Sequence, residues 1–174
     1  MRPYGDELLA QMRESLANVV TPSVSEDWPR YVAKAMELLL EHLELRWKHE
    51  LTFLAEDTVD MRELFGTMRK ELGAGASATN DAFGGVLADL DAILAEPAHA
   101  SGAVELRVLA EENEAHREVL ERALLRMDAV DNGDGSDLDD VRANIRQLLR
   151  RQLDRDVTLA RPTFMHFGPT PRAT

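Results

Sequence analysis

The stretch from residue 29 to residue 54 is apolar on two sides of one predicted helix. Its main stripe repeats at spacings of three and four residues, the period of an α-helix. That stripe consists of Met36, Leu40, Leu43, Trp47, Leu51 and Leu54. The second stripe keeps the same period on another side and consists of Leu38, His42, Leu45, His49 and Phe53. A helix that is apolar over more than one face is normally surrounded by other helices. We therefore predict a central helix, enclosed by its own chain or by a second copy of the chain.

Trp47 is the largest residue on the main stripe. If the chain encloses its own central helix, Trp47 is expected to be buried against the long helix that carries Leu109 and Leu120. A tryptophan buried in this way would hold a large share of the stability of the domain.

The main stripe continues beyond Leu54 to Gly73. Two arrangements fit this pattern. The first is one helix of about 44 residues, roughly 66 Å long at the standard rise. The second is a bend or break near Glu56, with Asp57 as the cap of a new helix. Because helices of this length are uncommon in a compact domain, we expect the bend or break between residues 29 and 72.

Four other segments show apolar residues at helical spacing, between residues 9 and 20, 83 and 94, 106 and 127, and 141 and 153. No segment shows the alternation of apolar and polar residues that is typical of a β-strand. The expected fold is all-α: a bundle of five or six helices around a long central helix, over residues 1–161. We expect a flexible connection at residues 73–81 and an irregular C-terminal tail at residues 162–174, which holds three of the seven prolines.

Composition excludes several classes of function. The net charge of −12 argues against general nucleic-acid binding, because phosphate contacts supply most of that affinity. The chain has no cysteine, so disulfides, thiolate zinc sites and a cysteine nucleophile are excluded. Its opening residues contain no apolar run, so we expect no signal peptide, no membrane span and a cytoplasmic location.

The sequence predicts no catalytic residue, metal or cofactor. A di-iron bundle needs Glu-x-x-His on two helices. Here Glu96 and His99 have this spacing, but Pro97 lies between them in a predicted loop. The acidic segment at residues 131–140 resembles a calcium loop, but the position of the bidentate acid is Val141. Motifs for phosphate loops and nucleophilic serines are also missing.

Two groups of polar residues remain as candidates for ligand binding. Asn113 and His116 lie one turn apart on the apolar seam of the segment between residues 106 and 127. They could fix the register of two helices, lie at a wet end of the bundle, or line a pocket. Arg142, Arg146 and Arg150 form a stripe that could hold a phosphate or carboxylate. Glutamates at spacings of three and four on the preceding helix could instead neutralise this stripe, with no ligand involved.

Two hypotheses of function follow. In the first, the chain is a non-catalytic helical interaction or accessory protein, expected to be a homodimer with a possible protein partner. In the second, it is a small-molecule-binding protein or enzyme that uses the three arginines for an anionic ligand and His116 as an acid or base. Local positive charge motivates the second hypothesis, because residues 142–174 carry seven arginines against two aspartates.

Three segments also resemble a family of uncharacterised bacterial all-helical proteins. They are DELLAQMRESLANVVTPS, RYVAKAMELLLEHLELR and LRRQLDRDVTLARPTFM. Arg30 matches the arginine before the second helix of that family, Lys34 or Ala35 replaces its central asparagine, and Arg161-Pro162 replaces its closing Asn-Pro. Members are commonly encoded near phosphotransferase-like and acyl-CoA dehydrogenase-like enzymes. The resemblance implies an accessory role and brings no catalytic residue to this chain.

The spacing of the histidines and carboxylates generates one prediction. Elemental analysis of the purified protein should find neither iron nor zinc in stoichiometric amount, because no single helix face offers a ligand set for these ions. One equivalent of either metal would show that a site is assembled across helices.

Overall fold

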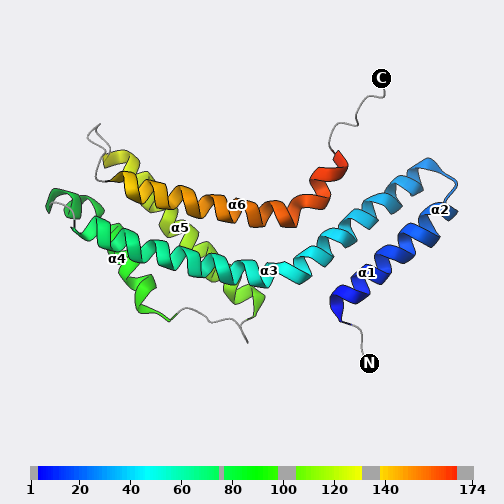
Figure 1. Cartoon of the computed structure of the whole chain (residues 1–174), viewed down its shortest axis with the longest axis horizontal. Coiled ribbons are helices and arrows are strands. Elements are labelled where there is room, and N and C mark those ends of the chain that lie inside the picture. Colours follow the sequence, from blue (N-terminus) through cyan, green and yellow to red (C-terminus); the bar gives the residue numbers. More distant parts are fainter. Residues whose placement is uncertain (1–3, 75–76, 98–104, 131–137, 168–174) are drawn as a thin grey trace, which may run out of the picture. The chain divides into compact units, whose positions relative to one another are not determined.

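The chain is all-α in the computed structural model (Figure 1). The structure describes residues 4–74, 77–97, 105–130 and 138–167, and these residues contain no strand. Its elements are α1 (Gly5–Ser15), a π-helical turn η1 (Leu16–Val20), α2 (Thr21–Ser23), α3 (Asp27–Ala74), α4 (Ser77–Ala95), α5 (Leu106–Val130) and α6 (Asp139–Phe167). The predicted all-α fold with a long central helix is confirmed. Within these ranges no helix is both long enough and apolar enough to cross a membrane.

The central helix α3 runs without interruption for 48 residues, so the chain does not break near Glu56 and no new helix begins there. Between Arg30 and Phe65 the sequence contains no proline or glycine, and nothing there removes a backbone hydrogen bond. Asp57 does not cap a new helix. It is buried, and its carboxylate lies 3.8 Å from the guanidinium of Arg117 on α5.

Two boundaries differ from the sequence expectation. The connection expected at residues 73–81 becomes helical at Ser77, where α4 begins. The irregular tail expected from residue 162 does not begin there, because α6 continues through Pro162 to Phe167. A proline removes one backbone hydrogen bond of a helix, which weakens the helix without always ending it. Residues 168–174 lie outside the described part of the chain.

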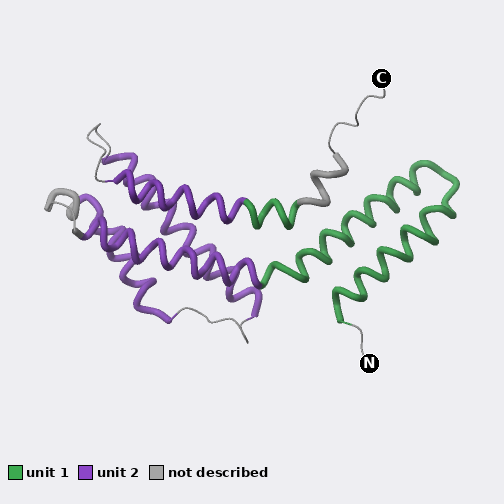
Figure 2. The backbone as a smooth tube through the Cα atoms, viewed as in Figure 1, with its two compact units in different colours: residues 1–51, 154–174 green, residues 52–153 purple. Residues whose placement is uncertain are grey.

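Contacts group the chain into two compact units, whereas the sequence predicts one domain over residues 1–161 (Figure 2). Unit 1 contains residues 1–51 and 154–174, and unit 2 contains residues 52–153. The helices α3 and α6 each contribute to both units.

Unit 2 holds the hydrophobic core of the described chain. Four helices contribute to it: α3 with Met61, Leu64, Phe65, Met68 and Leu72; α4 with Phe83, Val86 and Leu90; α5 with Val119, Leu120, Ala123 and Met127; and α6 with Val141, Ile145 and Leu148. Arg62 of α3 donates hydrogen bonds to the backbone oxygens of Ile93 (2.8 Å) and Glu96 (2.5 Å), at the C-terminal end of α4. These bonds satisfy carbonyl groups that a helix end leaves without partners.

Unit 1 has almost no core. Among its described residues only Thr21 and Ala33 are buried. Trp47 is 67% exposed, so the prediction that it is buried against the helix of Leu109 and Leu120 is wrong. The second apolar stripe is the more protected one, since His42 is half-buried and its Nδ1 lies 3.0 Å from the backbone oxygen of Leu159 on α6.

The division into a packed and an unpacked unit generates a prediction. Phe65→Ala removes a fully buried ring from unit 2 and should lower the free energy of unfolding by about 3–5 kcal/mol. Leu125→Ala, on the exposed side of α5 in the same unit, should lower it by less than about 0.5 kcal/mol. Urea denaturation of both variants at one protein concentration measures the difference. Equal losses would mean that the core is not where the structure puts it.

Candidate functional site

Asn113 and His116 lie on α5 inside unit 2, with side chains that are 2% and 3% exposed. The amide nitrogen of Asn113 lies 3.4 Å from the backbone oxygen of Leu54 and 3.4 Å from the hydroxyl oxygen of Thr58, both on α3. Their burial excludes the alternative of a wet bundle end. Because a buried amide needs partners, these bonds favour one register of α5 against α3.

His116 has an environment that keeps its imidazole neutral. Its ring packs edge-on against the ring of Phe65, with 5.6 Å between ring centroids. Its Nδ1 atom has no hydrogen-bond partner in the described part of the chain. Burial lowers the pKa of His116, Arg62 lowers it further, and Glu112 opposes the shift. A neutral, enclosed imidazole fits a packing role better than the role of an acid or base in contact with solvent.

The three candidate arginines of α6 do not share one environment. Arg146 and Arg150 are exposed, while Arg142 is half-buried and lies 3.9 Å from Asp139 of its own helix. Residues that face the core from α6 include Ile145 and Leu148. The candidate residues therefore divide into exposed and half-buried arginines on α6 and a buried pair on α5, and the structure does not gather them into one site.

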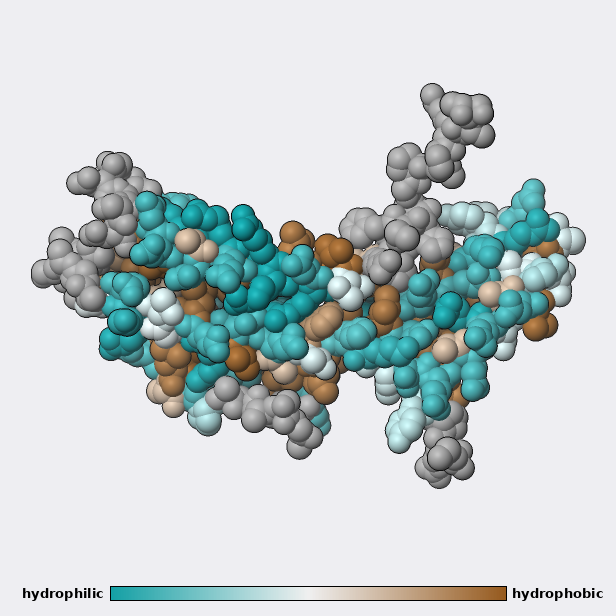
Figure 3. Space-filling model, viewed as in Figure 1, coloured by the Kyte–Doolittle hydropathy of each residue, from teal (hydrophilic) through white to brown (hydrophobic). Residues whose placement is uncertain are grey.

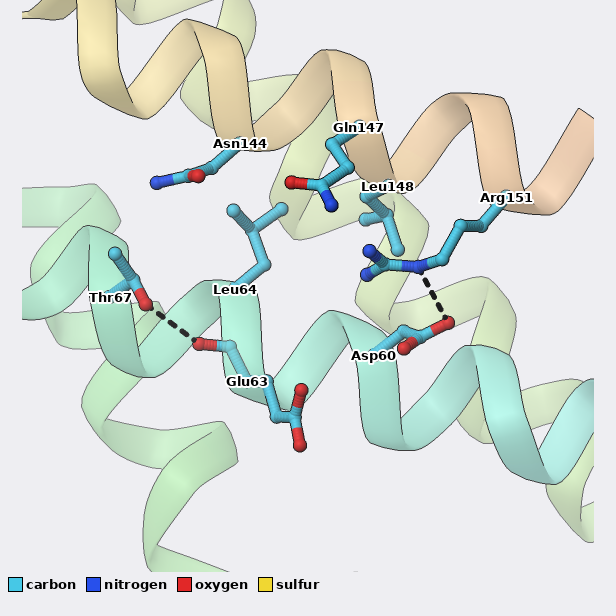
Figure 4. Close-up of a pocket in the computed structure, with 8 residues that line it drawn as sticks. All are labelled: Asp60, Glu63, Leu64, Thr67, Asn144, Gln147, Leu148 and Arg151. Atoms are coloured by element: carbon cyan, nitrogen blue, oxygen red, sulfur yellow. Dashed lines mark hydrogen bonds and ion pairs between the residues drawn. The ribbon is translucent and has the colours of Figure 1, made fainter.

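A small polar pocket in unit 2 was not anticipated from the sequence (Figure 4). It is lined by Asp60, Glu63, Leu64 and Thr67 of α3 and by Asn144, Gln147, Leu148 and Arg151 of α6. Its volume is about 160 Å³, below the roughly 300 Å³ at which pockets for organic ligands begin. Arg151 closes one side with an ion pair to Asp60, 3.3 Å from Nε to Oδ2. The pocket is suited to water or a small ion.

Metal chemistry finds no support among the described residues. No three histidine, aspartate or glutamate side chains there are close enough to hold an ion. His99 and the acidic residues 131–137 lie outside the described ranges.

The largest unpartnered feature is an apolar surface on unit 1. The continuous segment from α1 to α2 and residues 27–51 of α3 form a helical hairpin, and Figure 1 shows its two arms side by side. The exposed apolar side chains that we call the hairpin face are Leu8, Met12, Trp28, Val32, Met36, Leu39, Leu43 and Trp47. Figure 3 shows that apolar side chains reach the surface of the molecule between hydrophilic patches.

Polar contacts hold the two helices of the hairpin together. Near the turn, the hydroxyl of Thr21 donates a 2.6 Å hydrogen bond to Glu37. Further along, Arg13 of α1 forms an ion pair with Glu44 of α3 at 3.5 Å, and Glu44 also accepts a 2.7 Å hydrogen bond from Lys48. These polar contacts lie between the two arms of the hairpin, and the large apolar side chains are exposed on its surface.

The apolar residues of both helices lie on the same side of the hairpin. A Cβ atom added at Gly5 would lie 2.5 Å from Cζ2 of Trp47, so these two residues touch and mark one side. At about 100° per residue, Met12 points within about 20° of Gly5 along α1, and Leu43 within about 40° of Trp47 along α3. The two sets of side chains therefore form one surface.

No family model, curated protein or solved structure matches this chain.

The burial of His116 generates a prediction about pH. Because its folded pKa is lowered, the unfolded chain binds a proton below about pH 6.5 that the folded chain does not bind. The free energy of unfolding should therefore decrease as the pH drops from about 7.5 to about 5.5. The decrease should be smaller for His116→Leu than for the wild type. Urea denaturation at one protein concentration measures both. Identical pH dependence in the two proteins would contradict the buried neutral imidazole.

Proposed function

We propose that this chain is a non-catalytic helical interaction protein that associates with a second copy of itself. The observation that carries the proposal is the arrangement of unit 1, where a helical hairpin keeps large apolar side chains exposed and buries only Thr21 and Ala33. Short helices obtain most of their stability from packing an apolar face. A hairpin without a core therefore needs a partner to cover that face.

The size of the hairpin face agrees with a specific interface. Its eight side chains are about half exposed, and at roughly 200 Å² each they present about 800 Å² of surface. A standard protein interface buries about 800 Å² on each partner. Exposed apolar patches larger than a few hundred Å² on soluble proteins mark interaction sites.

The alternative of an anionic ligand has less support. It requires His116 to act beside the arginines of α6, yet His116 is enclosed in the core and Arg146 and Arg150 are solvated. An accessory role beside an enzyme remains part of the proposal, and it rests on the resemblance of three segments to the all-helical family. The hairpin face is the part of unit 1 best suited to such a protein contact.

Light scattering at micromolar concentration tests the proposal. We expect a mass of twice the 19.5 kDa of the chain, and we expect it to persist in high salt because an apolar interface does not depend on ion pairs. Dilution should lower the midpoint of thermal unfolding, since association stabilises the folded chain by mass action. A mass of 19.5 kDa at every concentration would refute self-association.

A further inference from the structure

We infer that the second copy binds the hairpin face with its own hairpin face, so that the two α3 helices pack antiparallel and cross near Leu39. This inference rests on the self-association proposed above and adds the surface, the direction of the helices and the residue on the two-fold axis. Three features of unit 1 carry it: the position of the apolar stripe on α3, the distribution of charge along the chain, and the positions of the two tryptophans.

The exposed stripe on α3 has Leu39 near its middle. It begins at Trp28 and continues one turn beyond Trp47, the last residue of the hairpin face, to the exposed Leu51, and Leu39 is itself 57% exposed. In a two-fold symmetric dimer the same patch of both copies meets. If one residue of the first copy contacts a second residue of the other copy, the same contact therefore recurs with the two copies interchanged. When two antiparallel copies of the stripe overlap fully, the midpoint lies on the axis. Ala35 of each copy then lies opposite Leu43 of the other, a small residue against a large one.

Charge favours the antiparallel direction over the parallel one. Residues 52–153 carry 11 Lys+Arg and 21 Asp+Glu, a net charge of −10, whereas all other residues together carry −2. Because α3 continues into unit 2 after Leu51, parallel hairpins would start both acidic units at the same end of the pair. Antiparallel hairpins start them at opposite ends, which lowers the repulsion between them.

Aromatic residues at both ends of the stripe agree with the same direction. Near the start of α3 the ring of Trp28 stacks on the ring of Tyr31, with 5.9 Å between ring centroids. Trp47 lies near the other end of the stripe. Antiparallel packing about Leu39 brings Trp28 of one copy within about one helical turn of Trp47 of the other. Tryptophan is enriched in interface cores, where its large apolar surface and N–H group are both used.

Single cysteines test the geometry, because the natural chain contains none. Facing residues on packed helices come within about 5–6 Å between Cα atoms, which is the span of a disulfide. Leu39→Cys should therefore form a disulfide-linked dimer under mild oxidation. Val32→Cys should not, since two copies of residue 32 lie about 21 Å apart in this arrangement. The double variant Val32→Cys with Arg46→Cys should link, because residues 32 and 46 lie opposite each other.

Leu125→Cys is the matched control for random collision. Leu125 is 63% exposed, close to the exposure of Leu39, and lies on α5 in unit 2. Oxidation of dilute protein should link Leu39→Cys at least tenfold faster than Leu125→Cys. Non-reducing gels measure the disulfide-linked fraction, and light scattering measures the mass of the same samples.

Each outcome has a distinct meaning. A wild-type dimer in which Val32→Cys links as fast as Leu39→Cys would overturn the antiparallel direction. A wild-type dimer in which Leu39→Cys links no faster than Leu125→Cys would place the interface elsewhere and overturn this inference alone. A wild-type monomer would refute the proposed self-association and this inference with it.

Tryptophan fluorescence gives a second readout that needs no substitution. Both tryptophans of the chain, Trp28 and Trp47, belong to the hairpin face. Their emission should move to shorter wavelength as the protein concentration rises through the dimer transition, because the interface removes water from both rings. A dimer transition without any change in emission would overturn the assignment of the surface.

Discussion

Hydrophobic burial along α3 is concentrated in the second half of that helix, and the rest of the structure depends on this asymmetry. Met61, Phe65 and Met68 are fully buried among α4, α5 and α6. Helix formation is cooperative with an unfavourable nucleus, so a segment that is fixed by packing favours extension of the helix beyond it. The packed half in unit 2 thereby supports the helical state of residues 27–51, which have little burial of their own.

The hairpin of unit 1 is the consequence of that extension. Its two helices are aligned by Thr21 with Glu37 and by Arg13 with Glu44. Ion pairs that are partly open to solvent contribute about 0–1 kcal/mol each, so they select an arrangement more than they stabilise it. The substantial free energy available to this unit lies in the apolar side chains that the hairpin leaves exposed. In the proposed dimer a second copy of the chain would offer an equal surface, and the low net charge of unit 1 would limit the repulsion between the copies.

The buried polar residues of unit 2 act within the same framework. Thr58 and Asn113 connect α3 to α5 through long hydrogen bonds, and His116 packs against Phe65 one turn further along α5. A slip of α5 by one turn would leave the Asn113 amide without partners in an apolar environment, which is costly. The polar pair therefore favours one packing of a core that is otherwise made of interchangeable apolar residues. This role requires no ligand.

The sequence by itself determined the helices, because helical periodicity is a local property that follows from the backbone repeat. It predicted the all-α fold and the apolar faces of α5 and α6, and it placed Asn113 and His116 on the apolar seam of their helix without deciding whether they are buried. It did not determine the continuity of α3 near Glu56. The usual length of helices does not decide the length of a particular helix, and the core packing of α3 begins just beyond that point. Nor did it identify the pocket around Asp60 and Arg151, whose residues lie far apart in the chain.

The exposure of Trp47 was decided only by tertiary structure. Two apolar stripes on one helix are equivalent in sequence, and the positions of distant helices decide which stripe is covered.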